Sequence, residues 1–519
     1  MNAEKVHHRD TKVTEISSAR NAFLHVLSVS VVISSLLCAC TVGPDFFSPK
    51  ADTPSGWTDT AINSKTASKA LAIPPANDEW WQSFHDSELT SLIARAAAAN
   101  LDLKDAALRI AESRIQERIT AAGELPTVSG NASYASTRFS DKTAQGQIFG
   151  ALGNIKGPPG FSIPAYPNPY DQYQLGFDAS WEPDLYGGVK RSEEAAAANT
   201  ETAVEQRRDA LVSLQGEVAH AYMDLRGTQL KLAITNNNLE TQRETLALTR
   251  DRFKALLGND LDVANAAAQV TSTESQLPLL QREIDTDINQ LSLLLAQEPG
   301  ALKAELETTN VVPPVPQDIP IGLPGDLARR RPDIRAAEAQ LHAATAQVGI
   351  AVANLYPSIT FSAPFGLQAE RPVNLASWAA AFYEIGPTVT IPIFQGGKLH
   401  ATVKLQEAQQ KQAAVDYAKT VLGAVHDVEN ALVTYATEQQ HRSALQATVA
   451  ENQRAVALAR QRYRNGITTF LDVLDAQRAQ LATELSLADS TEAVSTDLVA
   501  LFKALGGGWQ TEDTKEAAK

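Results

Sequence analysis

The chain has 519 residues, of which 44% are hydrophobic, 6% aromatic and 20% charged. Much of the hydrophobic share is alanine, which favours long helices with modest cores over the single large core of a compact enzyme. The net charge of −15 argues against a nucleic-acid partner. The two cysteines, Cys38 and Cys40, both lie at the end of an apolar run and are assigned to processing, so none remains to build a disulfide network or a thiolate metal site.

Residues 1–39 are predicted to be an export signal, because basic residues precede an apolar run at 22–37 and small residues follow it. The run is shorter than the ~20 apolar residues that a membrane-spanning helix needs. It ends in Leu37-Cys38-Ala39-Cys40, which resembles the signal box of lipoproteins. This resemblance implies that Cys40 becomes the acylated N-terminus and that Thr41 directs sorting to the outer membrane. An ordinary signal peptide cleaved nearby is the alternative.

Residues 40–79 are rich in Pro, Ser and Thr, and they predict an extended tether without periodicity. A first repeat is expected at 80–310. It begins with the sequence WWQSF, which leads into an Ala-rich helical pattern that runs to about Ala122.

Four segments alternate between apolar and polar residues with a period of two, which is typical of strands with two different faces. At about ten residues each, they have the length of strands that cross a membrane in a tilted barrel. A soluble β-sandwich would need more strands and shorter helices. The four segments are 128–134, 173–181, 359–367 and 383–393.

Gly pairs follow the second and the fourth segments, and helices without proline are expected directly after them, at 189–257 and 398–464. Each helix would be roughly 100 Å long at ~1.5 Å per residue. Shorter helices should return at 259–297, with a bend at Pro278, and at 469–505. A Pro-rich stretch at 311–324 opens the second repeat, 311–505, and 506–519 is expected to be a C-terminal tail.

The two helical hairpins are duplicates of each other. Six positions of the first hairpin tip are identical to six of the second at one constant offset, which is the signature of an internal repeat. They are Arg250, Arg252, Leu261, Asp262, Val263 and Ala266, which match Arg460, Arg462, Leu471, Asp472, Val473 and Ala476.

Three segments of the chain carry a resemblance to a known family. They are CTVGPDFFSP at 40–49, WWQSFHDSELTSLIARAAAANLDLKDA at 80–106, and LPGDLARRRPDIRAAEAQLHAATAQVGIAVANLYPSI at 323–359. They resemble the outer-membrane efflux lipoproteins of the TolC-like superfamily, of the NodT and OprM type, and the resemblance extends from Cys40 to about Leu505.

The expected fold is mainly α with a membrane β-barrel portion. Four strands cannot close a barrel, since the smallest barrels use about eight and an open edge in lipid leaves backbone groups unpaired. Three copies would supply about twelve strands. The resemblance implies the same homotrimer, with a β-barrel in the outer membrane joined to an α-helical barrel that crosses the periplasm.

The resemblance also implies a function, the exit duct of a tripartite efflux system. The duct would receive drugs or other small molecules from a periplasmic adapter and an inner-membrane pump, expected to be proton-driven. One alternative is a duct for type I peptide or protein secretion. Another is a periplasmic coiled-coil adapter lipoprotein, which would not need the four alternating segments. The sequence lacks HExxH, a nucleophile elbow and a phosphate loop, so we expect no enzyme, no metal, and no cofactor besides the lipid on Cys40.

Asp472 and Asp475 lie three residues apart at the start of a helix and therefore on one face. The segment LDVLDA resembles the family segment whose aspartates ring the periplasmic mouth of the closed channel. Capping of the helix by Asp472 after Thr469 is the alternative, and one residue can do both. The first repeat has Asn265 at the second position.

Tyr463 and Asp262 resemble the hydrogen-bonded pair that keeps the family's coiled coils closed. The alternative is that Tyr463 packs against its own hairpin. A second latch of the family falls on Thr468 and Leu261 here, so we expect it to be absent. The hairpin tips are expected to contact the adapter through Gly258, Asn259, Gly466, Ile467 and Thr468.

Overall fold

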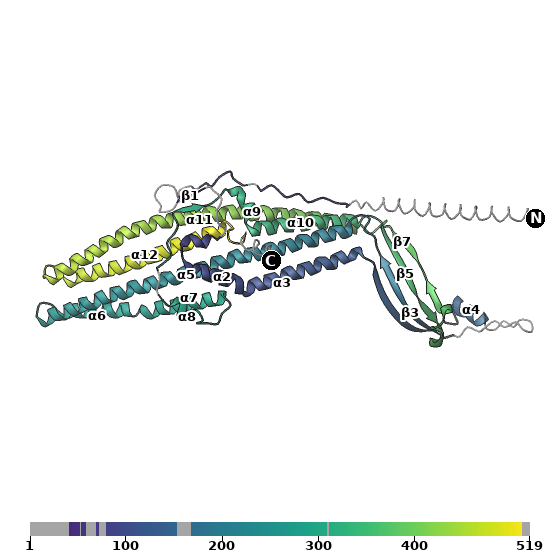
Figure 1. Ribbon diagram of the computed structural model, residues 1–519, viewed down its shortest axis with the longest axis horizontal. Coiled ribbons are helices and arrows are strands. Elements are labelled where there is room, and N and C mark those ends of the chain that lie inside the picture. Colours follow the sequence, from purple (N-terminus) through teal and green to yellow (C-terminus); the bar gives the residue numbers. More distant parts are fainter. Residues whose placement is uncertain are drawn as a thin grey trace, which may run out of the picture. The chain divides into compact units, whose positions relative to one another are not determined.

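The computed structural model describes residues 41–51, 53–58, 69–71, 79–152, 168–308 and 311–510. They form two compact units (Figure 1). Unit 1 is drawn from Met1–Phe46, Arg114–Ala197 and His342–Lys411, and unit 2 from Phe47–Ser113, Ala198–Leu341 and Gln412–Lys519. Each unit takes chain from both predicted repeats; in the sheet of unit 1, for example, β3 of the first repeat pairs with β5 of the second.

The sheet of unit 1 contains the four predicted strand segments. Its strands are β2 (Thr127–Thr137), β3 (Tyr170–Trp181), β5 (Ser358–Ala369), β6 (Ala381–Tyr383) and β7 (Gly386–Thr390). The order is β2-β3-β5, with β6 and β7 both paired to the far side of β5, and every pairing is antiparallel.

The strands β6 and β7 are consecutive parts of one extended segment, and both pair with β5 in the same register. Phe365 pairs with Tyr383 and Ser362 with Gly386. The interruption falls where Pro364 stands opposite Glu384: the Glu384 N–H donates to the Pro364 carbonyl at 3.0 Å, but proline has no N–H to return. The segment ends at Thr390 rather than at the predicted residue 393, and Pro392 follows.

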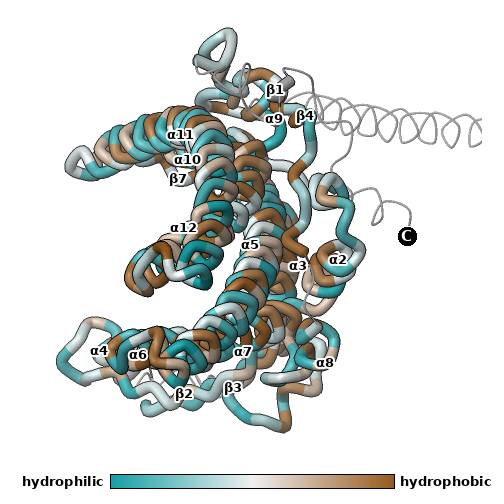
Figure 2. The backbone as a smooth tube through the Cα atoms, turned by 90° about the vertical axis from the view of Figure 1, so that its left-hand side faces the viewer, coloured by the Kyte–Doolittle hydropathy of each residue, from teal (hydrophilic) through white to brown (hydrophobic). Residues whose placement is uncertain are grey.

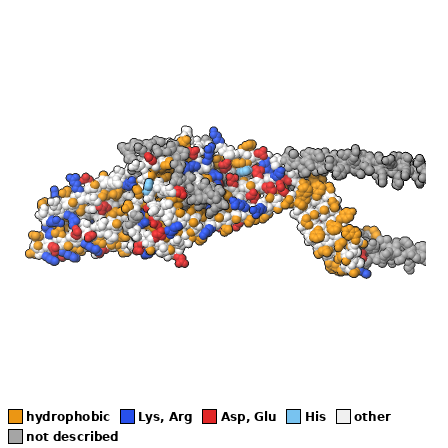
Figure 3. All heavy atoms as spheres, in the orientation of Figure 1, with side chains coloured by type: hydrophobic (Ala, Val, Ile, Leu, Met, Phe, Trp, Pro, Cys, Tyr) orange, Lys and Arg blue, Asp and Glu red, His pale blue; other side chains and the backbone are white. Residues whose placement is uncertain are grey.

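The predicted alternation is confirmed by the register. Phe177 stands opposite Gly130 on one side and Phe365 on the other, and Trp181 stands opposite Phe361, so the apolar residues of all strands share one face. This face is open, since the side chain of Phe177 is 63% exposed. Figure 3 shows hydrophobic side chains gathered over the strands.

Two helices of equal length follow the strands. They are α5 (Gly188–Lys254) and α11 (Lys398–Arg464), each 67 residues long. Gly187, Gly396 and Gly397, which precede them, have positive φ angles, so the predicted turns at the Gly pairs are present.

The returning chain differs between the repeats. In the first it is broken into α6 (Asp260–Glu274) and α7 (Leu277–Leu294), and Pro278 lies in the first turn of α7. In the second it is one helix, α12 (Phe470–Ala504). Pro278 therefore interrupts the helix rather than only bending it.

The other elements are shorter or connect these. They are β1 (Lys69–Leu71), η2 (Trp80–Phe84), α2 (Ser87–Ala99), α3 (Leu101–Ala121), η3 (Ala122–Glu124), α4 (Ala144–Leu152), α8 (Lys303–Leu306), β4 (Asp318–Pro320), η4 (Pro324–Asp326), α9 (Leu327–Arg330), α10 (Pro332–Ala353), η5 (Pro372–Asn374) and η6 (Trp378–Ala380). Within the described ranges, no helix has the length and apolar character needed to cross a membrane.

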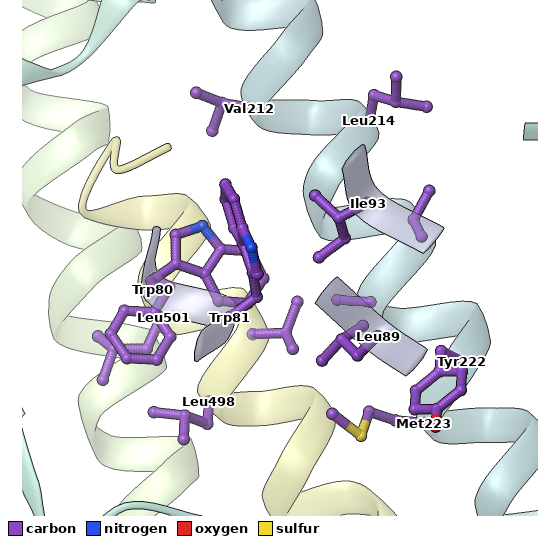
Figure 4. Close-up of a cluster of buried hydrophobic side chains, with 14 of the residues drawn as sticks. Trp80, Trp81, Leu89, Ile93, Val212, Leu214, Tyr222, Met223, Leu498 and Leu501 are labelled. Atoms are coloured by element: carbon purple, nitrogen blue, oxygen red, sulfur yellow. The ribbon is translucent and has the colours of Figure 1, made fainter. Parts of the chain in front are cut away.

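The core of unit 2 is built where η2 and α2 pack against α5 and α12 (Figure 4). Trp80 stacks on Phe502 with ring centroids 5.3 Å apart. Asp86 caps α2 by accepting from the N–H groups of Glu88 and Leu89, and it also accepts from the Tyr222 hydroxyl at 2.9 Å. One carboxylate therefore fixes both the start of α2 and its position against α5.

Parts of the predicted tether 40–79 are packed rather than extended into solvent. β1 pairs in parallel with β4 of the Pro-rich stretch that divides the repeats. The Trp57 indole N–H donates to the Gly322 carbonyl at 3.0 Å. These partners lie more than 200 residues away in sequence, so no local periodicity could have indicated them.

The start of the predicted tail, Gly506–Gln510, belongs to the core of unit 2. Trp509 is 7% exposed, and its indole N–H donates to the Arg330 carbonyl at 2.8 Å. The guanidinium groups of Arg208 and Arg335 lie 4.7 and 5.1 Å from the centroid of its ring. The tail prediction is therefore wrong for these five residues.

Trp509→Ala is expected to lower the free energy of unfolding by about 3–5 kcal/mol, because it leaves a cavity and removes both cation–π contacts. Thermal unfolding of the detergent-solubilised protein measures the effect. The matched control is Trp378→Ala, which changes a tryptophan that is 83% exposed. Equal shifts in the two variants would contradict a core role for Trp509.

Candidate pore mouth, hairpin tips and N-terminal strap

The long helices end in the same way at both hairpin tips. The Leu257 N–H donates to the Arg252 carbonyl at 2.8 Å and the Ile467 N–H to the Arg462 carbonyl at 2.9 Å, as in a Schellman motif. The residue before each donor has a positive φ, 62° at Leu256 and 70° at Gly466. The first tip therefore holds a leucine in a conformation that favours glycine.

The returning helices begin with different caps. At α6 the Asn259 side chain accepts from the Asp262 N–H at 2.8 Å. At α12 the Asp472 carboxylate accepts from the Thr469 N–H at 3.1 Å, from the Thr469 hydroxyl at 2.9 Å and from the Thr468 hydroxyl. The predicted capping role of Asp472 is therefore present.

These hydrogen bonds also set the charge of Asp472. The two threonine hydroxyls and the backbone N–H stabilise the ionised carboxylate and lower its pKa. Both Asp472 and Asp475 are exposed. The structure thus places the two predicted mouth residues on the solvent side of α12, and hydrogen bonds lower the pKa of Asp472.

The predicted hydrogen bond between Tyr463 and Asp262 is not formed within the chain. Tyr463 is buried and packs edge-on against Phe470, with ring centroids 5.7 Å apart. Among the described residues, its hydroxyl has no hydrogen-bond partner. The alternative prediction, that Tyr463 packs against its own hairpin, holds for the contact with Phe470, but the same apolar cluster also contains Leu239 and Leu246 of α5.

Arg252 makes the connection between the tips that the sequence analysis missed. Its Nη1 donates to the Arg464 carbonyl at 3.1 Å and its Nη2 to the Leu257 carbonyl at 3.2 Å. Its guanidinium also lies 4.8 Å from the centroid of the Tyr463 ring. One cation therefore binds the C-terminal end of both long helices, where the helix dipole favours positive charge. The sequence did contain a signal for this role, because Arg252 is identical to Arg462 at the matching position of the second repeat.

The hairpin tips carry exposed apolar side chains in addition to the predicted contact residues. Of the predicted contact residues Gly258, Asn259, Gly466, Ile467 and Thr468, only Ile467 is a large exposed hydrophobic residue. Leu256, at 91% exposure, is not among the residues that the sequence analysis predicted for this contact. Other exposed apolar side chains at the tips are Leu257, Leu261 and Leu471.

The first described residues, Thr41–Phe46, form a segment that we call the strap. Its Val42 N–H donates to the Tyr186 carbonyl at 3.1 Å. A Cβ placed on Gly43 would lie 2.5 Å from the Gly349 Cα, so the backbone of the strap touches the backbone of α10. Phe46 stacks on His342 with ring centroids 4.3 Å apart.

Arg191 on α5 is the centre of this docking site. Its side chain is 5% exposed and forms ion pairs with Asp45 of the strap at 2.6 Å and with Glu194 at 2.7 Å. Burial alone would raise the pKa of Glu194, but hydrogen bonds from Arg191 and His342 lower it. Cys40 lies outside the described residues, one position before the strap.

The chain matches a family described as outer membrane efflux protein over residues 92–297 and 323–507. The chain belongs to this family. Over 92% of its length it is 31% identical to nodulation protein T of Rhizobium leguminosarum bv. trifolii, covering 96% of that protein. Over 95% it is 31% identical to the toluene efflux pump outer membrane protein TtgC of Pseudomonas putida, covering 97% of that protein.

Solved structures agree with the family. The outer-membrane channel OprN has a TM-score of 0.79 and 33% identity over 91% of this chain and all of that one. The open state of the MtrE outer membrane channel of Neisseria gonorrhoeae has a TM-score of 0.72 and 28% identity over 91% of this chain and 99% of that one. This efflux protein therefore has the fold of the TolC-like outer-membrane channels, as the sequence predicted.

In this efflux protein, Asp45→Asn is expected to raise the population of molecules with an undocked strap about tenfold. The charged hydrogen bond to Arg191 contributes roughly 1.5–3 kcal/mol, reduced here because Asp45 is exposed. Hydrogen–deuterium exchange of the Val42 N–H, which is bonded to the Tyr186 carbonyl, measures the release. The control is Asp141→Asn, which affects an exposed pair with Arg138 at 4.0 Å and should leave the exchange rate unchanged. Equal exchange rates in the two variants would contradict the docking role of Asp45.

Proposed function

We propose that this protein is the outer-membrane exit duct of a tripartite efflux system. It would passively conduct drugs or other small molecules from an inner-membrane pump and a periplasmic adapter to the exterior. The observation that carries the proposal is a sheet with one open apolar face, whose strands lead directly into α5 and α11. The outer-membrane pump component TtgC supports small molecules over secreted peptides as the cargo.

The functional form would be a homotrimer. In the described sheet β2 pairs only with β3, and β6 and β7 pair only with β5, so both outer edges are free. Unpaired backbone groups are costly in lipid, and three sheets joined edge to edge would give about twelve strands in a closed barrel. The apolar face would meet lipid and the polar face the lumen.

The partners would be a periplasmic adapter at the hairpin tips and an inner-membrane pump, expected to be proton-driven. The exposed leucines and Ile467 of the tips suit an apolar contact with the adapter. The family supports a channel over a coiled-coil adapter and over an enzyme. We propose no cofactor other than a lipid on Cys40.

Asp472 and Asp475 would line the periplasmic mouth. Three protomers would bring together about six carboxylates, and rings of acidic side chains select cations. Their exposure in the single chain leaves them available for this role, and the three hydrogen bonds to Asp472 favour its ionised form.

The double variant Asp472→Asn with Asp475→Asn is expected to bring the cation-over-anion permeability ratio close to one and to abolish reversible block by divalent cations. Asparagine keeps the size and the capping ability of aspartate while removing its charge. Reversal potentials in planar bilayers measure the ratio. Asp262→Asn, at the matching position of the first repeat, is the control. Unchanged selectivity in the double variant would restrict both aspartates to structural roles.

Cys40→Ser is expected to abolish acylation and leave a precursor or mis-sorted protein, because the thiol that carries the lipid is lost. Labelling of cells with a palmitate analogue detects the modification. Cys38→Ser is the matched control and should be labelled normally. Label on the Cys40→Ser protein would show that the lipid lies elsewhere.

A further inference from the structure

A cavity of about 550 Å³ lies in unit 1, where the strands of the sheet meet the long helices (Figure 1). Its wall is formed by the chain between β3 and α5, the end of α10, the start of β5 and the chain at the end of β7. The two helices approach closely here, because a Cβ placed on Gly188 would lie 3.3 Å from the Cβ of Ala353. The wall therefore joins all these elements of the unit into one site.

The cavity opens on the polar side of the sheet. Ser358 of β5 pairs with Thr390 of β7, and both residues line the cavity. Successive side chains of a strand point to opposite faces, so these two lie on the face opposite to Phe361. Figure 2 shows hydrophilic and hydrophobic residues in turn along α5, as expected of a helix with one packed and one wet face. In the proposed duct, the polar face would meet the lumen, and the cavity would adjoin the path of the cargo.

Two stacked tyrosines form part of the wall. The rings of Tyr186 and Tyr356 have centroids 4.7 Å apart and planes inclined by 20°. Tyr356 is 43% exposed, so part of its ring is open to a ligand. Its N–H donates to the Ala353 carbonyl at 3.0 Å, and the Tyr186 carbonyl accepts from the Val42 N–H of the strap at 3.1 Å. The backbone thus holds both rings at the cavity, and the face of such a ring attracts cations.

The charge of the wall is negative. Among the described residues that line the cavity, the charged ones are Glu182 and Asp184. Asp184 is fixed at the start of α5, since its Oδ2 accepts from the Lys190 N–H at 2.9 Å. Burial, together with the nearby carboxylates of Glu124 and Asp184, raises the pKa of Glu193 in the first turns of α5. The carboxylates of this region therefore repel one another, and a bound cation would relieve the repulsion.

The rest of the wall selects the kind of cation. Its apolar side chains include Val189, Ile350, Pro357, Ile359 and Pro392. An inorganic cation prefers a shell of oxygen ligands and gains nothing from apolar and aromatic walls. The volume lies in the range of sites for drug-sized molecules, which combine apolar walls with a few polar groups. Charge, ring faces and apolar surface together fit an organic cation.

We propose that this cavity binds amphiphilic organic cations on their way through the duct, with Tyr186 and Tyr356 against the ligand and Glu182 and Asp184 facing its charge. The inference rests on the proposed function as an exit duct and adds a class of cargo to it. Three copies of the chain would place three such cavities around the lumen, between the helical part and the barrel.

The test uses benzyltrimethylammonium as the probe, because this ion is charged at every pH and cannot donate a hydrogen bond. Calorimetric titration of the full-length protein purified in detergent is expected to show binding, and benzenesulfonate, an anion of similar size, should bind at least tenfold more weakly. Tyr356→Leu is expected to weaken binding of the probe about fivefold through loss of the ring face. Tyr356→Phe keeps the ring and should retain the affinity.

The charges are tested by Glu182→Gln with Asp184→Asn, which keeps a hydrogen-bond acceptor for the Lys190 N–H and should weaken binding of the probe about tenfold. The matched control is Asp472→Asn with Asp475→Asn, which removes two carboxylates at a hairpin tip and should leave the affinity unchanged. Thermal unfolding shows whether each variant is folded, and the charge variant decides the test if Tyr356→Leu does not fold.

Equal losses of affinity in the two double variants would overturn the inference, because they would show general attraction of cations by the protein. Equal affinities of the probe for the wild type and for Tyr356→Leu would overturn it as well. Currents in planar bilayers separate the inference from the proposed function. A wild-type protein that conducts but does not bind the probe overturns the inference alone, whereas one that binds the probe but does not conduct overturns the proposed function.

Discussion

The two free edges of the sheet are the constraint on which the rest of this protein depends. At one edge of the sheet, β2 pairs only with β3, and at the other edge, β6 and β7 pair only with β5. The outward backbone N–H and C=O groups of these edge strands have no strand partner among the described residues. An apolar face such as that around Phe177 favours lipid, yet lipid offers no hydrogen bonds to an open edge. Association of several copies satisfies both demands. The proposed association of three copies would also place three identical pairs of hairpins around one axis.

The duplicated chain uses its two halves differently. Gly466 takes the left-handed conformation at one tip without strain, whereas Leu256 takes it at the other and presents an apolar side chain to solvent. Arg252 bridges the tips, although its repeat partner Arg462 has the same sequence context. Duplication supplies the shared architecture of hairpins and strands. The differences at single positions supply an asymmetric tip surface, and Asp475 of α12 stands where α6 has Asn265.

Long-range contacts hold the ends of the chain to the body. Asp45 of the strap neutralises the buried Arg191, and Trp509 lies between two guanidinium groups. The strap also donates the Val42 N–H to the Tyr186 carbonyl, which ties it to the chain between β3 and α5.

The sequence by itself determined the four strand segments, the apolar face that they share, the two long helices, the duplication and the family. Each of these depends on local periodicity or on motifs within a few dozen residues, and Asp472 as a cap was predictable for the same reason. Only the tertiary structure decided that the Tyr463 hydroxyl has no hydrogen-bond partner among the described residues, and that described parts of the predicted tether and tail are packed. Their partners lie far away in sequence, and a side chain's hydrogen bonds depend on which distant helix faces it, which no local pattern encodes.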